Sequence, residues 1–133
     1  MEVVSVVCNA ASYRPGDPFA TSVAYMLLDL VSTTAAQDGR DYYDISGAYP
    51  VAFAYGHATC RPTLPGGDCE TCLTNAVAQM GASRGDSFGA TIVLVDCRVR
   101  YEHYARSWDS TFIRAAACTG RCSLADFFFR FLP

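Results

Sequence analysis

Cysteines are the most reactive feature of this sequence, and three of them share one short segment. Cys60, Cys69 and Cys72 form a C-x8-C-x2-C pattern, and Cys97 follows a strongly apolar run. Seven cysteines in 133 residues are typical of a disulfide-bonded secreted protein. The alternative is zinc bound by four thiolates, but such sites usually use two close pairs, and only Cys69 and Cys72 are close. We therefore predict disulfides, with no metal and no cofactor.

Three further cysteines, Cys8, Cys118 and Cys122, lie outside this pattern. The odd total leaves at least one thiol unpaired or bonded to another chain. Disulfides imply secretion, yet the sequence starts without a recognisable signal peptide, because the first two residues are not basic and the apolar residues 3–7 are too few. We expect either that the initiating methionine replaces a removed signal or that the sequence is incomplete at its start.

Two patterns that occur in enzymes are also present. Residues 85–89 read Gly-Asp-Ser-Phe-Gly and match the G-x-S-x-G nucleophile motif around Ser87. That motif needs a strand before it and a helix after it, whereas here a predicted helix precedes and a predicted strand follows. His57 and His103 are candidates for activating a cysteine, but the nearby Cys60 belongs to the predicted bridges. We expect a glycine-rich loop, structural or surface histidines and no enzyme activity.

The composition argues against several classes of partner. A net charge of -3 and a pI near 5.1 argue against nucleic acid, which needs a basic protein face for its phosphates. The same values argue against a polybasic membrane-binding patch. We expect no membrane span, because no stretch approaches the roughly 18 to 20 apolar residues that cross a bilayer. The hydrophobic fraction of 51% is enough for one packed core.

The hydrophobic pattern predicts the elements that position these residues. Helical spacing predicts helices at residues 17–36 and from 68 onward, with Asp17-Pro18 and Asp68 as their starts and a loop at 81–89. β-branched and apolar runs predict strands at residues 3–7, 42–45, 51–55 (running on toward Cys60), 91–95 and 98–102. This order implies an α+β fold: an antiparallel sheet of about five strands with two helices packed on one face, stabilised by disulfides.

The two segments around Cys97 carry the clearest strand signals. Residues 91–95 are expected to form a central strand buried on both faces. Residues 98–102 either continue that strand or form the next one after a bend. Their alternation places Arg98, Arg100 and Glu102 on one side, with Cys97, Val99 and Tyr101 on the other.

The cysteine pattern and its flanking segments resemble the ginkbilobin-homologous domain, also called the stress-antifungal or salt-stress-response domain. The segments are Tyr-Gly-His-Ala-Thr at 55–59 and Leu-Val-Asp at 94–96, each directly before a cysteine. The resemblance covers about residues 3–104, so we predict such a domain at 1–105 and an atypical tail at 106–133. The family includes plant secreted antifungal proteins and ectodomains of cysteine-rich receptor-like kinases. It implies an antiparallel sheet with two helices.

The resemblance also implies a disulfide map. Two bridges follow from it, Cys60–Cys69 and Cys72–Cys97. The family's remaining bridge joins the cysteine after the first strand, here Cys8, to a position that Arg84 occupies in this chain. The chain departs from the family there, so we expect Cys8 to be free or bonded to Cys118 or Cys122.

Some family members resemble mannose-binding lectins, and this similarity implies a site of three polar residues. Asn9 and Glu102 match the family's asparagine and glutamate, whereas Thr91 occupies the position of its arginine. An amide, a carboxylate and a cation suit a sugar because together they donate to and accept from vicinal hydroxyls. Thr91 has one hydroxyl and no charge. Arg98 or Arg100, on the predicted Glu102 face, are the residues that would compensate.

The sequence therefore predicts a secreted, apoplastic plant defence protein that binds carbohydrate, such as mannose or fungal mannan, without enzyme activity. The loss of arginine at Thr91 favours the alternative, a protein-interaction module related to receptor-like kinase ectodomains. A truncated or non-functional relative is a third hypothesis. The aromatic residues 127–132 in the tail are interpreted as an interaction patch, as sequence unrelated to the domain, or as packing on the sheet.

Overall fold

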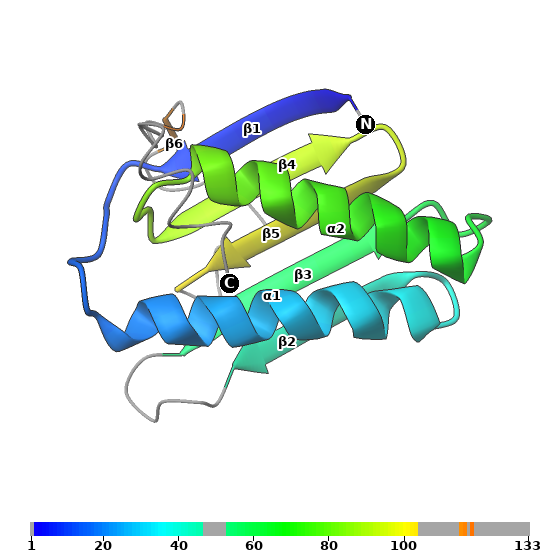
Figure 1. Ribbon diagram of the computed structural model, residues 1–133, viewed down its shortest axis with the longest axis horizontal. Coiled ribbons are helices and arrows are strands. Elements are labelled where there is room, and N and C mark those ends of the chain that lie inside the picture. The colour runs from blue at the N-terminus through cyan, green and yellow to red at the C-terminus, as the bar shows by residue number, and fades with distance from the viewer. Residues whose placement is uncertain (1, 47–52, 104–114, 117, 119–133) are drawn as a thin grey trace.

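The computed structural model describes residues 2–46, 53–103, 115–116 and 118 (Figure 1). Its strands are β1 (Val3–Asn9), β2 (Asp41–Ser46), β3 (Ala54–Cys60), β4 (Gly89–Leu94), β5 (Cys97–Glu102) and β6 (Ala115–Ala116), and its helices are α1 (Pro18–Ala36) and α2 (Gly66–Ser83). All strand pairs are antiparallel, in the order β2-β3-β5-β4-β1-β6. The predicted α+β fold is confirmed, and the two-residue β6 adds a sixth strand beside β1.

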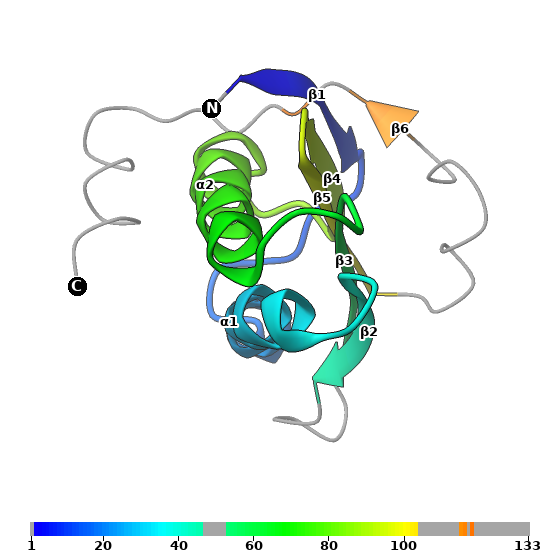
Figure 2. The same ribbon diagram turned by 90° about the vertical axis from the view of Figure 1, so that its right-hand side faces the viewer.

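The fold has two layers, because both helices lie on the same face of the sheet (Figure 2). Helix α1 packs on β2 and β3, and helix α2 packs mainly on β4 and β5. The two helices also contact each other along the sheet. Within the described residues, neither helix covers the opposite face. The strands therefore turn one row of side chains into the core and the other row away from it.

Helix α1 begins where the sequence predicts. Asp17 is the N-cap, and its carboxylate accepts a hydrogen bond of 2.9 Å from the Phe19 amide. Pro18 occupies the first helical position, where its missing N–H has no intrahelical partner to lose. The helix ends at Ala36, and the chain then turns through Gly39 and Arg40, both at positive φ. Local sequence signals alone are enough to set both ends of this helix.

Helix α2 begins earlier than predicted. Pro65 is the N-cap residue and makes no side-chain capping bond, so the expected start at Asp68 is wrong. Asp68 instead lies in the first helical turn, where its negative charge interacts favourably with the helix dipole. The helix continues to Ser83, past the predicted loop start. Its extra last turn carries the chain to Arg84.

Strands β4 and β5 form a hairpin-like pair, so β5 is the next strand and not a continuation of β4. The alternation predicted for β5 is present, with Val99 and Tyr101 buried on the helix side. The expectation that β4 is buried on both faces is wrong. Ile92 is fully buried, whereas Thr91 and Val93 are only half-buried. The reason is the two-layer architecture, in which helices cover one face.

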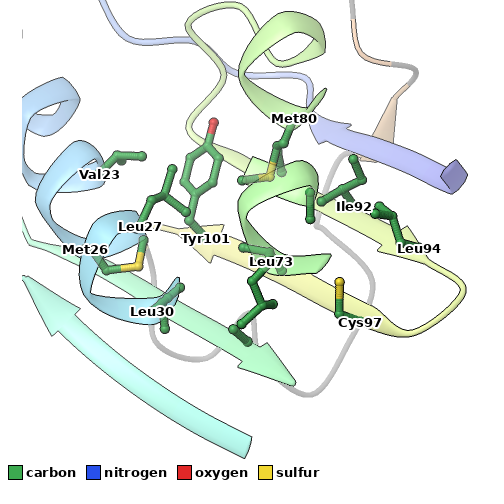
Figure 3. Packing of buried hydrophobic residues seen from close by; sticks show 14 of the residues in the cluster. Val23, Met26, Leu27, Leu30, Leu73, Met80, Ile92, Leu94, Cys97 and Tyr101 are labelled. Atoms are coloured by element: carbon green, nitrogen blue, oxygen red, sulfur yellow. The ribbon is translucent and has the colours of Figure 1, made fainter. Parts of the chain in front are cut away.

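The core lies between the helices and the sheet (Figure 3). It contains Val23, Leu27 and Leu30 from α1, Leu73 and Met80 from α2, and Ile92 and Tyr101 from the sheet. Each buried aliphatic side chain contributes about 1.5–3 kcal/mol relative to exposure to water. Gly56 on β3 is required by this packing, because a Cβ there would overlap the sulfur of Met26.

Helix α1 is apolar on its outer side as well as on its core side. By length and composition it is long and apolar enough to cross a membrane, with a mean hydropathy of 1.3. This result contradicts the expectation that no stretch approaches that character. In the fold, 44% of the apolar stretch is buried, including Val23 and Leu30. Tyr25 and Leu28 remain exposed, so the helix presents an apolar surface outward.

Three disulfides connect the layers and the edge of the sheet. The bridges are Cys60–Cys69, Cys72–Cys97 and Cys8–Cys118. The first two, which the family resemblance implies, attach α2 to β3 and β5. The third shows that Cys8 is bonded to Cys118, one of the two partners that the sequence left open. It attaches the chain just after β6 to β1. Cys122 and, apart from residues 115–116 and 118, the predicted tail at 106–133 lie outside the described residues.

Candidate functional site

Three strand ends meet at one end of the sheet. Asn9 is the last residue of β1 and Glu102 the last of β5, while Gly89 is the first of β4. Because β4 runs antiparallel to both neighbours, these three positions form one row across the sheet. Gly89 pairs with Glu102, and Cys8 pairs with Ala90, which places Asn9 beside Gly89. The fold therefore brings together two of the three predicted site residues, 93 positions apart in sequence.

The side-chain amide of Asn9 is oriented by two hydrogen bonds. Its Oδ1 accepts from the Ala11 amide at 3.0 Å, as in an Asx turn. Its Nδ2 donates to Oε1 of Glu102 at 3.3 Å. Since the oxygen is engaged by the loop, the amide nitrogen faces the carboxylate. Asn9 therefore positions the carboxylate as well as offering a second N–H.

Glu102 is buried, with 1% of its surface exposed. Its Oε1 accepts from the His103 backbone amide at 3.2 Å and lies 2.9 Å from His103 Nδ1. Its Oε2 is buried and has no hydrogen-bond partner within the described part of the chain. Such an oxygen is costly to leave unsatisfied, by about 1–3 kcal/mol. Gly89 makes room for it, because a Cβ at that position would overlap the carboxylate.

The third predicted residue, Thr91, lies on the same face as this row. It is two positions after Gly89 on β4 and is half-buried. Its direct cross-strand partner is Arg100 on β5, and Arg100 is two residues before Glu102. Directly opposite residues have Cβ atoms about 4.5–5.5 Å apart. The guanidinium-bearing residue Arg100 therefore lies directly beside Thr91, where the resemblance implies an arginine. Arg98 pairs with Val93, one step further from Glu102.

The enzyme-like motifs have structural roles in the fold. Ser87 lies between the end of α2 and the start of β4, so the strand–turn–helix context of a nucleophile elbow is not formed there. Its hydroxyl is buried, 2.5 Å from the Asn9 carbonyl and 2.9 Å from the Gly89 carbonyl. His57 is buried with Nε2 at 2.6 Å from Asp41, and its ring stacks on Tyr43. Cys60, its proposed partner, is in a disulfide.

Arg84, which the resemblance aligned with a bridged cysteine, contacts two tyrosines. Its Nη1 donates to Tyr13 Oη at 2.9 Å and to Tyr101 Oη at 3.4 Å. Burial raises the pKa of Tyr101 to about 12, so its hydroxyl stays protonated at physiological pH and donates to the Ser87 carbonyl. Burial lowers the pKa of Arg84, but the tyrosine oxygens more than offset this, and the pKa is raised.

The site's described side chains are hydrogen-bonding groups. In that part of the chain, no cluster of three histidine, cysteine, aspartate or glutamate side chains is placed to hold a metal ion. What remains is a carboxylate with one unsatisfied oxygen, an oriented amide, a hydroxyl and a neighbouring guanidinium. These groups suit a neutral polyhydroxyl ligand, which both donates and accepts.

The fold and the disulfides define a small disulfide-bonded α+β domain. Comparisons with known proteins identify its family. The chain belongs to the salt stress response/antifungal family, which it matches over residues 7–104. It is 38% identical over 102 residues to antifungal protein ginkbilobin-2 of Ginkgo biloba, covering 74% of each chain. It is 36% identical over 105 residues to antifungal protein ginkbilobin-like protein 1 of Picea glauca, covering 77% of this chain and 72% of that protein.

A solved structure shows the same fold. The tandem DUF26 ectodomain of the Arabidopsis thaliana cysteine-rich receptor-like protein PDLP5 matches with a TM-score of 0.72 and 26% identity. The match covers 79% of this chain and 51% of that one, so this chain spans about half of the ectodomain. The resemblance drawn from the cysteine pattern is confirmed.

Sequence reasoning missed the residues that support the site. Gly89 makes room for the carboxylate, and His103, interpreted as structural or surface, contacts Glu102 directly. Ser87 anchors the Asn9 and Gly89 backbones from the loop. The available signal was proximity in sequence: Ser87 and Gly89 belong to the motif at 85–89, and His103 directly follows Glu102. That signal becomes useful only once the strand register is known.

Proposed function

We propose that the protein is a plant defence protein that binds carbohydrate at the Asn9–Glu102 row. The observation that carries the proposal is the Oε2 of Glu102, which has no hydrogen-bond partner among the described residues and lies next to an oriented amide. A sugar hydroxyl donating to this oxygen would relieve the cost of its burial. The antifungal names of the Ginkgo biloba and Picea glauca relatives support a role in defence.

Arg100 takes the place of the missing arginine in this proposal. Arg100 is the residue of β5 directly opposite Thr91, and Thr91 itself offers a hydroxyl. Arginine's fork of N–H donors reaches several hydroxyl oxygens from either strand. Because Glu102 is 1% exposed, binding requires the groups around its carboxylate to move apart. That rearrangement predicts weak affinity, in the millimolar range.

Titration calorimetry with mannose and with mannan tests the proposal. Heat of binding is expected with the wild type, and Glu102→Gln should weaken it roughly tenfold or more, since a hydrogen bond to a charged group contributes about 1.5–3 kcal/mol. Arg100→Gln should weaken binding by a similar factor. Arg98→Gln is the matched control, on the same strand and face but further away. Absence of heat up to roughly tens of millimolar sugar would reject mannose binding.

A protein-interaction module is the second candidate, and the burial of Glu102 is the observation that favours it. The matched ectodomain of a receptor-like protein supports this alternative. A glycan array separates the two candidates. A mannose signal lost in Glu102→Gln supports the lectin, whereas an array silent for all sugars supports the module.

We further propose that the protein is extracellular and acts without enzyme activity. Three disulfides in a domain of this size support an oxidising compartment. Detection of the protein with all three bridges intact in apoplastic fluid tests the location. A protein recovered only from cell extracts with free thiols would contradict it.

A further inference from the structure

A groove of about 680 Å³ lies between α1 and α2, on the outer surface of the helix layer. Its volume falls within the range of about 300–1,000 Å³ that is usual for small-molecule sites. Leu28 and Ala24 of α1 and Ala78 of α2, all exposed, form part of its walls. The two helices are neighbours in both views of the fold (Figures 1 and 2). The groove is on the opposite side of the molecule from the Asn9–Glu102 row.

The walls of the groove are mostly aliphatic. Helix α1 contributes Leu27, Leu28 and Val31, and α2 contributes Val77 and Ala78. The exposed Leu28 belongs both to these walls and to the apolar outer side of α1. An aliphatic chain buried along such walls gains about 0.8 kcal/mol per methylene.

Charge is confined to two residues, Glu70 and Arg84, at opposite ends of α2. They are roughly 20 Å apart along the helix at 1.5 Å per residue. Among the described residues, no carboxylate pairs with Arg84, whose hydrogen bonds go to two tyrosine hydroxyls. Its Nε is buried and has no hydrogen-bond partner in this part of the chain. The groove therefore ends at a guanidinium that has no carboxylate partner among the described residues.

We propose that this groove binds a long-chain aliphatic carboxylate, with the alkyl chain along the walls and the carboxylate at the Arg84 end. Glu70 fixes the direction, because it repels an anion at the other end. A charge-assisted hydrogen bond to the guanidinium supplies selectivity for an acid over an alcohol. The site is independent of the proposed sugar site and would bind a ligand of a different chemical class.

Titration calorimetry with octanoate, decanoate and dodecanoate, below micelle formation, tests the proposal on the intact protein. Affinity should rise about two- to fourfold for each added methylene, as partial to full burial of the chain requires. Decanoate should bind at least about tenfold more tightly than decan-1-ol, because the alcohol lacks the charged hydrogen bond. Equal affinity of the acid and the alcohol would overturn the assignment of Arg84.

Variants separate the two parts of the site. Arg84→Gln should bring the affinities of decanoate and decan-1-ol together while retaining the dependence on chain length. Arg98→Gln, on the opposite face of the sheet, is the matched control and should leave both unchanged. Ala78→Trp fills the groove and should abolish binding of every probe, whereas Thr71→Trp, at an exposed position of α2 outside the groove, should not.

Two results would overturn the proposal even if all variants fold. One is undiminished binding of decanoate to Ala78→Trp, which would place the ligand elsewhere. The other is a dimer, detected by sedimentation of the free protein, that Ala78→Trp dissociates and decanoate does not. That result would identify the occupant of the groove as a second copy of the chain.

Discussion

The two ends of helix α2 are attached to the sheet by different physical means. At its start, Cys69 and Cys72 are bonded to Cys60 and Cys97 on neighbouring strands. Just past its end, Arg84 is held between two tyrosine hydroxyls, with its guanidinium carbon 5.4 Å from the Tyr101 ring centroid. The first end is attached by covalent bonds, and the second is attached by hydrogen bonds.

The difference lies in which state of the chain each attachment affects. A disulfide stabilises the fold chiefly by restricting the unfolded chain, and the restriction persists whatever the native contacts do. The Arg84 contacts exist only in the folded state, and their strength comes from their sheltered surroundings. Substitutions at the two ends should therefore differ in size and in the state on which they act.

The largest effect is expected from the Cys72→Ser/Cys97→Ser double substitution. The bridge closes a separation of 25 residues, for which the loop-entropy estimate is about 3–4 kcal/mol. Urea unfolding should show a loss of this size in the free energy of unfolding. The slope of the transition should also rise, because the unfolded chain becomes more extended. A loss below about 1 kcal/mol would show that the bridge acts little on the unfolded state.

An intermediate effect is expected from Arg84→Met, which keeps an aliphatic side chain but removes the donors. Tyr13 and Tyr101 lose their shared donor, and hydrogen bonds involving a charged group contribute about 1.5–3 kcal/mol. Arg98→Met removes an exposed charge and should cost at most about 0.5 kcal/mol. Urea unfolding of both variants gives the comparison. Equal losses would mean that the tyrosine contacts contribute nothing beyond surface charge.

The smallest effect is expected at the half-buried Asp44 near the surface, where neither a covalent bond nor deep burial operates. Burial and then the adjacent Asp29 raise the pKa of Asp44 to about 6. A raised pKa stabilises the fold below the ordinary value of 3.8, and this contribution is lost as the pH rises through about 6. At pH 7, Asp44→Asn should therefore be more stable than the wild type, by at most about 1 kcal/mol after solvent screening.

Thermal unfolding at pH 4 and pH 7 measures this effect. The difference in stability between the two pH values should be smaller in Asp44→Asn than in the wild type. Asp38→Asn is the matched control, since Asp38 is exposed beyond the end of α1. Identical pH dependence in all three proteins would contradict a perturbed Asp44.

Local sequence signals correctly predicted the elements whose ends are determined by neighbouring residues. Asp17 and Pro18 lie next to the turn that they start, so α1 was located correctly. The start of α2 was misplaced because Pro65, which makes no capping bond, gives no such local signal. The burial of β4 was overestimated because it depends on which face the helices cover. Which face the helices cover depends on the whole sheet, and the β-branched and apolar run at residues 91–95 does not encode it.

The candidate site was less predictable because its contacts join distant segments. Asn9 and Glu102 were chosen through the family resemblance alone, since neither is unusual in its own surroundings. The burial of Glu102 depends on the missing side chain of Gly89, and the pairing of Thr91 with Arg100 depends on strand register. A change of register by one residue would turn Arg100 to the other face. Residues that act through register become visible only in three dimensions.

The Cys8–Cys118 bridge has a consequence for survival outside the cell. It spans 110 residues, so most of the chain is closed into one covalent ring. A protease that cuts once inside this ring opens it without releasing a fragment, and both new ends stay attached to the same molecule. Such a nicked protein would run as one band before reduction and as two after it. Damage of this kind can be tolerated for as long as the surroundings remain oxidising.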